Sequence, residues 1–288
     1  MTLHPLRLFA VNLFAFLFAA LAAANTLVID PEAAPDPTPL DPDAAGFHSV
    51  FDKETSLPGG VWPAGYAHPD AWNDTAWHAD RAVPTPGGLR LDIARERARG
   101  KRHTGAEMHV NGTHHYGRYE VVMRPARGDG LVSAFFLFTG PMHGTPKDEI
   151  DIEFVGRDTT RVQLNYFTGA KSYGGAWIDL PYDAADHFQL YAFEWDPGEI
   201  RWYIGDQLVY RADGSKLAIP SHAGNTIFSL WAAHPSLSGW TGPIRYEDGA
   251  SMAVQCVSYA PPGDWGARCS DDFKSDLPPI ERTDDPGA

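Results

Sequence analysis

Cysteine is scarce in this chain of 288 residues, which contains only Cys256 and Cys269. Two cysteines cannot build a disulfide-dense mini-scaffold or a four-cysteine zinc site. Basic residues are also few, with 23 Lys and Arg against 37 Asp and Glu and a formal net charge of −14. A protein that binds nucleic acid by neutralising phosphates needs the opposite balance, so we expect no nucleic-acid partner.

Long apolar runs are missing as well, and the longest one lies near the N-terminus. Residues 8–21 are apolar apart from Asn12, follow Arg7 and precede three alanines at 22–24. This run is shorter than the roughly 20 apolar residues of a transmembrane helix. A basic residue, an apolar run and a small-residue site in succession are typical of a secretory signal peptide. We therefore predict a signal peptide at 1–24, a secreted or periplasmic mature protein, and no membrane association in the mature form.

Composition divides the remaining chain into three parts. Residues 25–46 contain a dense tract of Pro, Asp and Ala, which blocks helices and sheet ladders and predicts an extended linker. Residues 270–288 are acidic and contain prolines, which predicts a flexible tail. The part between them, residues 47–269, has no internal repeat, and we expect it to form one domain that acts as a monomer.

The patterns in this domain are almost all those of β-strands. Segments that alternate polar and apolar residues, or form short apolar runs, occur at 119–125, 132–138, 161–167, 191–195, 200–204 and 207–211. Turn sequences rich in Gly, Pro and Asp separate several of them. Only residues 89–99 have the composition of a short helix. Many short strands between turns predict an all-β sandwich or jelly roll.

The most informative segment runs from Asp148 to Phe154. Carboxylates and apolar residues alternate along it, so a strand places Glu149, Asp151 and Glu153 on one face and Ile150, Ile152 and Phe154 on the other. Three like charges on one strand face repel one another, so their presence needs an explanation. A solvated acidic strand and a cation site are two explanations without catalysis. Glycoside hydrolysis uses such carboxylates, one to attack the anomeric carbon and one to protonate the leaving oxygen.

The spacing of these carboxylates sets a condition on the fold. Positions 149 and 153 of a flat strand lie about 13 Å apart between Cα atoms, whereas retaining catalysis needs carboxyl groups about 5–5.5 Å apart. We therefore expect a concave sheet on which the two side chains lean together. We also expect the charge of the middle carboxylate to help keep a neighbouring Glu protonated.

Segments around these carboxylates carry a resemblance to a known family, namely residues 116–126, 134–141, 144–156, 158–167 and 228–231. In register from about Glu107 to Trp240, the sequence resembles the bacterial licheninases of glycoside hydrolase family 16 and related glycanases that cleave exopolysaccharides. The resemblance implies a concanavalin-like β-jelly roll with a concave substrate groove. It further implies that Glu149 is the nucleophile, Asp151 the assisting carboxylate and Glu153 the acid/base.

The same resemblance places further residues in the substrate groove: Glu107, Phe136, Gln163, Asn165 and Trp231. Aromatic faces stack on sugar rings, and amide and carboxylate groups bond hydroxyls, so these residue types suit the task. Phe136 is equally compatible with a place in the core. Trp240, in a loop of Gly, Ser and Pro, is expected to form a groove wall with Trp231, whereas Trp195 and Trp202 flank a hairpin turn and are expected to pack in the core.

Four expected groove residues depart from the licheninase pattern: His109 replaces Arg, Lys147 replaces Trp, and Phe138 and Phe167 replace Tyr. Lys147 shares the parity of the three carboxylates, so a continuous strand aims it into the same groove. Its ammonium could recognise an acidic substituent on the substrate, or it could balance the charge of the carboxylates.

Several residues bear on disulfides and metals. Cys256 and Cys269 lie 13 positions apart around a Pro-Pro-Gly turn in a chain expected to be exported, which predicts a disulfide, with two free thiols as the alternative.

Gln255 falls where the family often has a calcium-binding Asp, and a neutral amide is the weaker ligand, so we expect little or no structural calcium. His109, His114 and His115 lack the Cys or spaced acid that would complete a site, so we expect no metal and no cofactor.

These observations predict a retaining endo-β-glucanase that hydrolyses β-1,3-1,4-glucan. One alternative is a glycanase that depolymerises a bacterial succinoglycan-type exopolysaccharide, since the groove departs from the licheninase pattern. A transglycosylase would differ in its products when sugar acceptors are present. An alternative of another class is a non-catalytic sugar-binding protein on the same fold, which would gain nothing from three aligned carboxylates.

Overall fold

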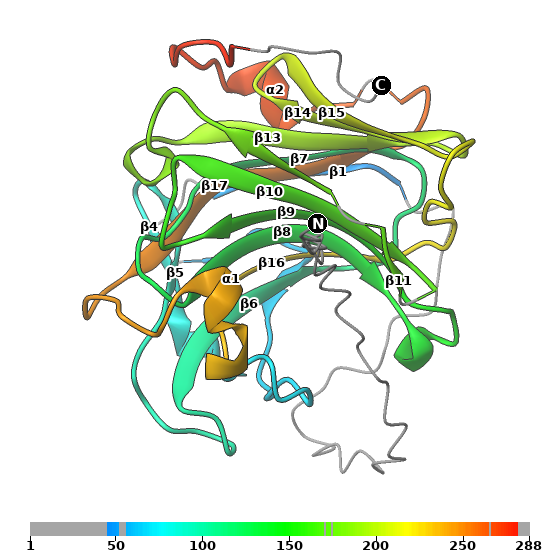
Figure 1. Cartoon of the computed structure of the whole chain (residues 1–288). Coiled ribbons are helices and arrows are strands. Elements are labelled where there is room, and N and C mark those ends of the chain that lie inside the picture. Colours follow the sequence, from blue (N-terminus) through cyan, green and yellow to red (C-terminus); the bar gives the residue numbers. More distant parts are fainter. Residues whose placement is uncertain (1–44, 52–55, 170, 174, 265, 282–288) are drawn as a thin grey trace, which may run out of the picture.

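Two β-sheets packed face to face form the body of the protein (Figure 1), and this confirms the predicted all-β jelly roll. The computed structural model describes residues 45–51, 56–169, 171–173, 175–264 and 266–281. The predicted signal peptide and residues 25–44 of the predicted linker lie outside the described residues. The first described strand begins at Phe47.

One sheet, which we call the back sheet, has the strand order β15 (Gln207–Asp213), β14 (Glu199–Ile204), β13 (Gln189–Trp195), β7 (Gly117–Arg124), β17 (Ser251–Ala260), β5 (Gly88–Asp92) and β4 (Ala82–Thr85), with β1 (Phe47–Val50) paired to β17. The other, the concave sheet, has the order β11 (Lys171–Ser172), β10 (Arg161–Thr168), β9 (Asp148–Val155), β8 (Leu131–Thr139), β16 (Asn225–Ala232), β6 (His103–Val110) and β2 (Val61–Pro63), with β12 (Ala176–Asp179) on β10 and β3 (Thr75–Trp77) on β6. The long central strands of the concave sheet curve together in Figure 1.

Helical structure in the described part of the chain is limited to short turns. The 3-10 turns are η1 (Ala79–Arg81), η2 (Pro141–His143), η3 (Ala184–Asp186) and η4 (Pro235–Leu237), and the α-helical turns are α1 (Ser238–Thr241) and α2 (Cys269–Asp272). None of these is long and apolar enough to cross a lipid bilayer. Residues 89–99, which have the composition of a short helix, instead begin in strand β5, where Leu89 and Leu91 are buried on one strand face.

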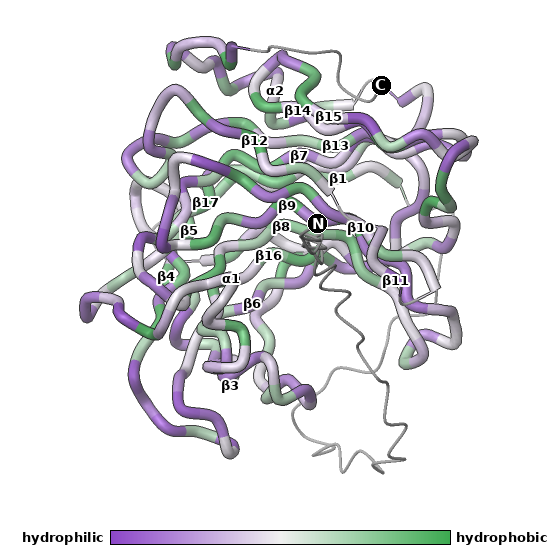
Figure 2. The backbone as a smooth tube through the Cα atoms, in the orientation of Figure 1, coloured by the Kyte–Doolittle hydropathy of each residue, from purple (hydrophilic) through white to green (hydrophobic). Residues whose placement is uncertain are grey.

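The core lies between the two sheets, and Figure 2 shows hydrophobic stretches along their strands with hydrophilic residues in the outer loops. Ile150, Ile152 and Phe154 are fully buried there, which leaves the carboxylates of β9 on the opposite face. Trp195 and Trp202 are buried as expected. The indole Nε1 of Trp202 crosses the core and donates a hydrogen bond to the carbonyl oxygen of Asp151 at 3.2 Å. The back sheet thereby supports strand β9 from behind.

The segment after Cys269 contacts the domain as far as Ile280, in contrast to the flexible tail expected from composition. The backbone N–H of Ile280 donates to Gln207 Oε1 at 2.7 Å, and Ile280 is buried. Gln189 Nε2 on the back sheet donates to Ser275 Oγ at 2.8 Å. These contacts join residues far apart in sequence, so composition alone could not predict them. Residues 282–288 lie outside the described residues.

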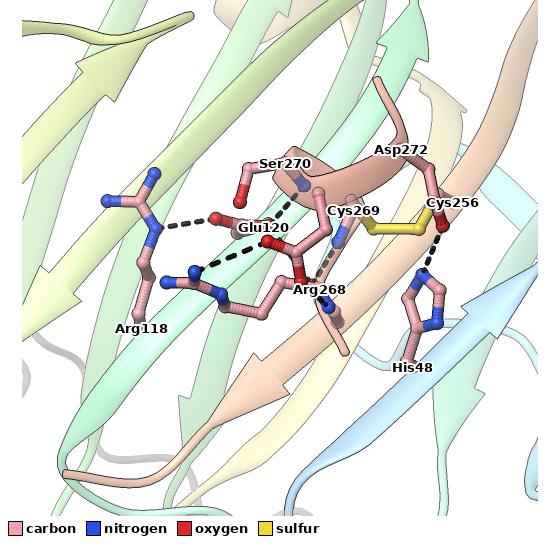
Figure 3. The surroundings of a disulfide bond; sticks show 10 residues. His48, Arg118, Glu120, Cys256, Arg268, Cys269, Ser270 and Asp272 are labelled. Carbon is pink, nitrogen blue, oxygen red and sulfur yellow. Dashed lines mark hydrogen bonds and ion pairs between the residues drawn. A yellow bond between two sulfur atoms is a disulfide. The ribbon is translucent and has the colours of Figure 1, made fainter. Parts of the chain in front are cut away.

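A disulfide joins Cys256 on β17 to Cys269 at the start of α2, with 5.7 Å between the Cα atoms (Figure 3). Beside it, the buried Glu120 carboxylate pairs with Arg118 and accepts a hydrogen bond from the backbone N–H of Ser270 at 2.9 Å. These interactions fix the start of the C-terminal segment to the back sheet, away from the carboxylates of β9.

Removing this disulfide is expected to lower stability without changing the groove. A Cys256→Ser, Cys269→Ser double variant should lose about 3 kcal/mol of unfolding free energy, the value that the chain-entropy model gives for a loop of this size. Denaturant unfolding measures the loss, and wild-type protein unfolded in reductant provides the matched control. A double variant within about 0.5 kcal/mol of the wild type would contradict the prediction.

Candidate active site

Strand register places the predicted site residues on one face of the concave sheet. Along β9, Glu149 pairs with Phe138 of β8 and Phe167 of β10, while Asp151 pairs with Phe136 and Asn165. Directly paired residues project to the same side of a sheet. The three carboxylates therefore stand in the middle of this face, with strands of aromatic and amide residues on both sides.

The surroundings of Glu153 differ from those of Glu149. Glu153 pairs with the small Ala134 on β8, which in turn pairs with Ser229 on β16, and with Gln163 on β10. The neighbours of Glu153 on β8 and β16 are thus small, whereas two phenylalanines flank Glu149. Sequence reasoning did not single out Ala134 or Ser229, because their place beside Glu153 follows only from the register between strands.

Burial raises the pKa of all three carboxyl groups. For Glu153, burial and then the negative charge of Glu149 raise the pKa to about 8. Burial and the charges of both neighbours hold the pKa of Asp151 well above its usual range. Burial also raises the pKa of Glu149, and the ammonium of Lys147 opposes that rise. Burial and Glu149 thus keep Glu153 protonated at neutral pH, and Lys147 is the group that favours the charged form of Glu149.

One detail differs from the sequence-based expectation. We expected the charge of the middle carboxylate to keep a neighbouring Glu protonated. In the structure, burial and the charge of Glu149, not the charge of Asp151, raise the pKa of Glu153. The physical reason is that Asp151 is itself buried between two carboxylates, which disfavours its charged form.

Lys147 lies beside the presumed nucleophile. Its Nζ is 2.6 Å from Glu149 Oε2 and 4.0 Å from the ring centroid of Phe167, with the Phe138 ring centroid at 6.0 Å. The ammonium therefore contacts the Glu149 carboxylate and the face of the Phe167 ring. Of the two interpretations of Lys147, this geometry favours charge balance at Glu149.

Replacing Lys147 is expected to move the acidic side of the pH profile. Because the ammonium opposes protonation of Glu149, Lys147→Trp should raise the pKa of Glu149 and shift the acidic limb of kcat/KM to higher pH. Lys147→Arg keeps the charge and serves as the matched control, with a smaller shift. An unchanged acidic limb in Lys147→Trp would show that the ion pair does not control this ionisation.

A second cluster lines the groove on the side of β6. Glu107 on β6 accepts a hydrogen bond from Tyr66 Oη at 2.6 Å, and His109 Nε2 lies 2.9 Å from the same Oε1 atom. The His109 ring stacks on Trp62 of β2 with centroids 4.3 Å apart. Sequence reasoning named Glu107 and His109 but missed Trp62 and Tyr66, which lie in an edge strand and loop whose position depends on tertiary pairing.

Tryptophans stand beyond Glu153. Trp240 Nε1 donates to Gln163 Oε1 at 2.6 Å, and the Trp240 and Trp231 rings lie 6.1 Å apart. Trp231 is only 6% exposed and packs edge-on against Trp72, another residue that sequence reasoning did not single out. Trp231 thus supports a groove wall whose more exposed parts are Trp72 and Trp240.

Metal-ligand geometry was found at one place in the part of the chain that the structure describes. Within the described residues, His48, Cys256 and Cys269 are the group of ligand-type side chains close enough together to hold an ion, and the two sulfurs form the disulfide. The three histidines have separate surroundings: His109 stacks on Trp62, His115 stacks on Tyr116, and His114 packs at a tilt against Tyr259. Burial lowers the pKa of His114 to about 4, as expected for a neutral packing residue.

Comparison with known proteins agrees with this geometry. The family model "Glycosyl hydrolases family 16" matches residues 70–248. A β-glucanase of Bacillus amyloliquefaciens is 40% identical over 197 residues, covering 67% of this chain and 80% of that protein. The endo-1,3-1,4-β-glycanase ExoK of Rhizobium meliloti (strain 1021) is 32% identical over 201 residues, covering 68% and 74% of the two chains.

Among solved structures, a prokaryotic β-1,3-1,4-glucanase (lichenase) derived from a mouse hindgut metagenome superposes with a TM-score of 0.70 at 34% identity, covering 76% of this chain and all of that one. The chain belongs to glycosyl hydrolases family 16. It is a glycoside hydrolase that acts on O-glycosyl bonds, and the carboxylates of β9 stand at the centre of its groove.

Proposed function

We propose that this protein is a retaining endo-β-glucanase that hydrolyses β-1,3-1,4-glucan. The observation that carries the proposal is the row of Glu149, Asp151 and Glu153 on the concave face, with Glu153 held protonated and Glu149 paired to Lys147. An open groove lined by aromatic and amide side chains suits the interior of a long sugar chain. Similarity to β-glucanases supports the choice of substrate.

The reaction proceeds by two displacements. The Glu149 carboxylate attacks the anomeric carbon and forms a glycosyl ester while the bond to the leaving oxygen breaks, and Glu153 gives its proton to that oxygen. The Glu153 carboxylate then takes a proton from water, whose oxygen attacks the anomeric carbon and releases Glu149. Each step inverts the anomeric carbon, so the product keeps the β-configuration. Asp151, between the two, is placed to bond the nucleophile and the ring hydroxyls.

We further propose that the protein works outside the cytoplasm as a monomer. The support is the composition of residues 1–24, which resembles a cleaved signal peptide, together with the cysteine pair in a chain expected to be exported. Mass spectrometry of the N-terminus and light scattering of the mature protein test both statements.

A second candidate is depolymerisation of an acidic bacterial exopolysaccharide. A specific observation favours it: the groove departs from the licheninase pattern at His109, Phe138 and Phe167, and the ExoK glycanase is among the relatives. Hydrolysis of lichenan, laminarin, xyloglucan and a succinoglycan-type polymer under one set of conditions separates the candidates. The highest kcat/KM on lichenan supports the first proposal, and the highest value on the succinoglycan-type polymer supports the second.

A further inference from the structure

A pocket of about 230 Å³ opens at the Glu153 end of the groove. Its walls include two arginines and two tryptophans, Arg157, Arg161, Trp177 and Trp240. The pocket adjoins the catalytic row through Gln163, which pairs with Glu153 on one side and Trp177 on the other and accepts a hydrogen bond from Trp240. Gln163 alone therefore separates Glu153 from Trp177 in the pocket wall.

The position of Glu153 indicates which side of the cleaved bond lies near this pocket. The acid protonates the leaving oxygen, so the leaving-group half of the chain lies on the Glu153 side of the cleaved bond. Two residues further along a strand add about 6.6 Å, which is comparable to one sugar ring. The pocket is thus within reach of the first or second sugar on the leaving-group side.

The two arginines have donor capacity left over. The Arg161 guanidinium lies 4.2 Å from the Trp177 ring centroid, and its buried Nε has no hydrogen-bond partner, with Asp179 Oδ1 at 3.9 Å. Arg157 Nη1 contacts only the carbonyl oxygen of Gly239, at 3.4 Å, and has no carboxylate partner among the described residues. An unpartnered guanidinium is a bidentate donor for a carboxylate.

Neither nearby acid forms a hydrogen bond with the two guanidinium groups within the described residues. The Asp158 Oδ1 atom in the pocket wall already accepts hydrogen bonds from Thr160 N and Thr160 Oγ1, at 3.2 and 2.6 Å. Asp179 is 90% exposed, so water screens its weak interaction with Arg161. Arg157 and Arg161 thus keep N–H donors for a ligand, in a pocket that Trp177 and Trp240 also line.

We infer that this pocket is a leaving-group-side subsite for a carboxylate-bearing sugar. The inference rests on the proposed glycanase function and adds the chemical class of one sugar unit: a hexose whose carboxylate pairs with Arg157 and Arg161 while its ring stacks on Trp177 or Trp240. Lys147 stands at the opposite end of the carboxylate row, so this subsite is independent of the ion pair at Glu149.

The test uses lichenan in which a small share of the C6 hydroxyls has been oxidised to carboxylates, and the same batch after reduction of those carboxylates to alcohols. The double variant Arg157→Gln, Arg161→Gln should lose about tenfold or more in kcat/KM on the oxidised polymer relative to the reduced one. Arg211→Gln, on β15 of the back sheet, is the matched control and should leave this ratio unchanged. Products sequenced by mass spectrometry should carry the uronate at the first or second position from the new non-reducing end.

A parallel arm with succinylated lichenan distinguishes a carboxylate on a substituent from one on the ring. A selective loss on either polymer supports the subsite and identifies the carrier of the carboxylate. Equal losses on the acidic polymers and the neutral control would overturn it. If the wild type cleaves no glucan, the proposed function fails instead, and calorimetry of acidic and neutral oligosaccharides with Glu149→Gln, with and without the two Arg substitutions, still decides the subsite.

Discussion

Glu149→Ala is expected to lower kcat on lichenan by about 10⁴-fold or more, because removal of a nucleophile abolishes the covalent route. The variant should fold normally, since Glu149 faces the groove and its core-facing neighbours Ile150 and Ile152 are unchanged. Added azide, a small external nucleophile, should restore turnover by entering the space of the missing carboxylate. It should attack the face that Glu149 uses and give a glycosyl azide of the α-configuration.

The matched control is Glu247→Ala, which removes an exposed carboxylate from a loop and should leave kcat within about twofold of the wild type. A β-configured azide from Glu149→Ala would mean that Glu149 acts on the leaving-group side, and the roles of Glu149 and Glu153 would have to be exchanged.

Glu153→Gln is expected to lower kcat by about 10²–10⁴-fold on lichenan, the usual contribution of a general acid. A glucan oligosaccharide with a dinitrophenyl leaving group needs no protonation at the leaving oxygen, so its first displacement should be nearly unaffected. A burst of dinitrophenol followed by slow turnover is therefore expected, because the variant also lacks the base for the second step. Loss of the burst would contradict the assignment of Glu153.

The pH profile of the wild type should carry the signature of the same group. The acid must be protonated, and its pKa is raised to about 8, so kcat/KM should fall as the pH rises through about 8. An ordinary Glu with a pKa of about 4.3 would already be ionised at neutral pH. The alkaline limb should disappear for the dinitrophenyl substrate, whose leaving group needs no acid.

The sheets and the catalytic row could be predicted from sequence because both depend on the period-two pattern of single strands. Alternation places Ile150 and Ile152 in the core and the carboxylates opposite them whatever the rest of the chain does. Strand β5 and the C-terminal segment were harder to predict from sequence. Arg and Glu residues between 94 and 99 give the region the composition of a helix, although the strand ends at Asp92. The C-terminal segment is held by contacts of Ile280 and Ser275 with residues far away in sequence.

The groove walls were predictable only in part. Residues on the central strands, such as Phe136 and Asn165, were expected in the groove from the family resemblance, and the register places them beside Asp151. Trp62 and Tyr66 lie in an edge strand and a loop, and their place beside His109 and Glu107 depends on pairing across more than forty residues, for which a single sequence carries no local signal. The same holds for Trp177, which reaches the pocket through the pairing of β12 with β10.

Proton NMR of the first products from lichenan tests the central claim most directly. A two-displacement mechanism with Glu149 as nucleophile and Glu153 as acid/base releases the new reducing end in the β-configuration. The β-anomer should therefore appear first, with the α-anomer growing in only as fast as mutarotation allows. Initial release of the α-anomer would mean a single displacement by water and would contradict the roles assigned to both glutamates.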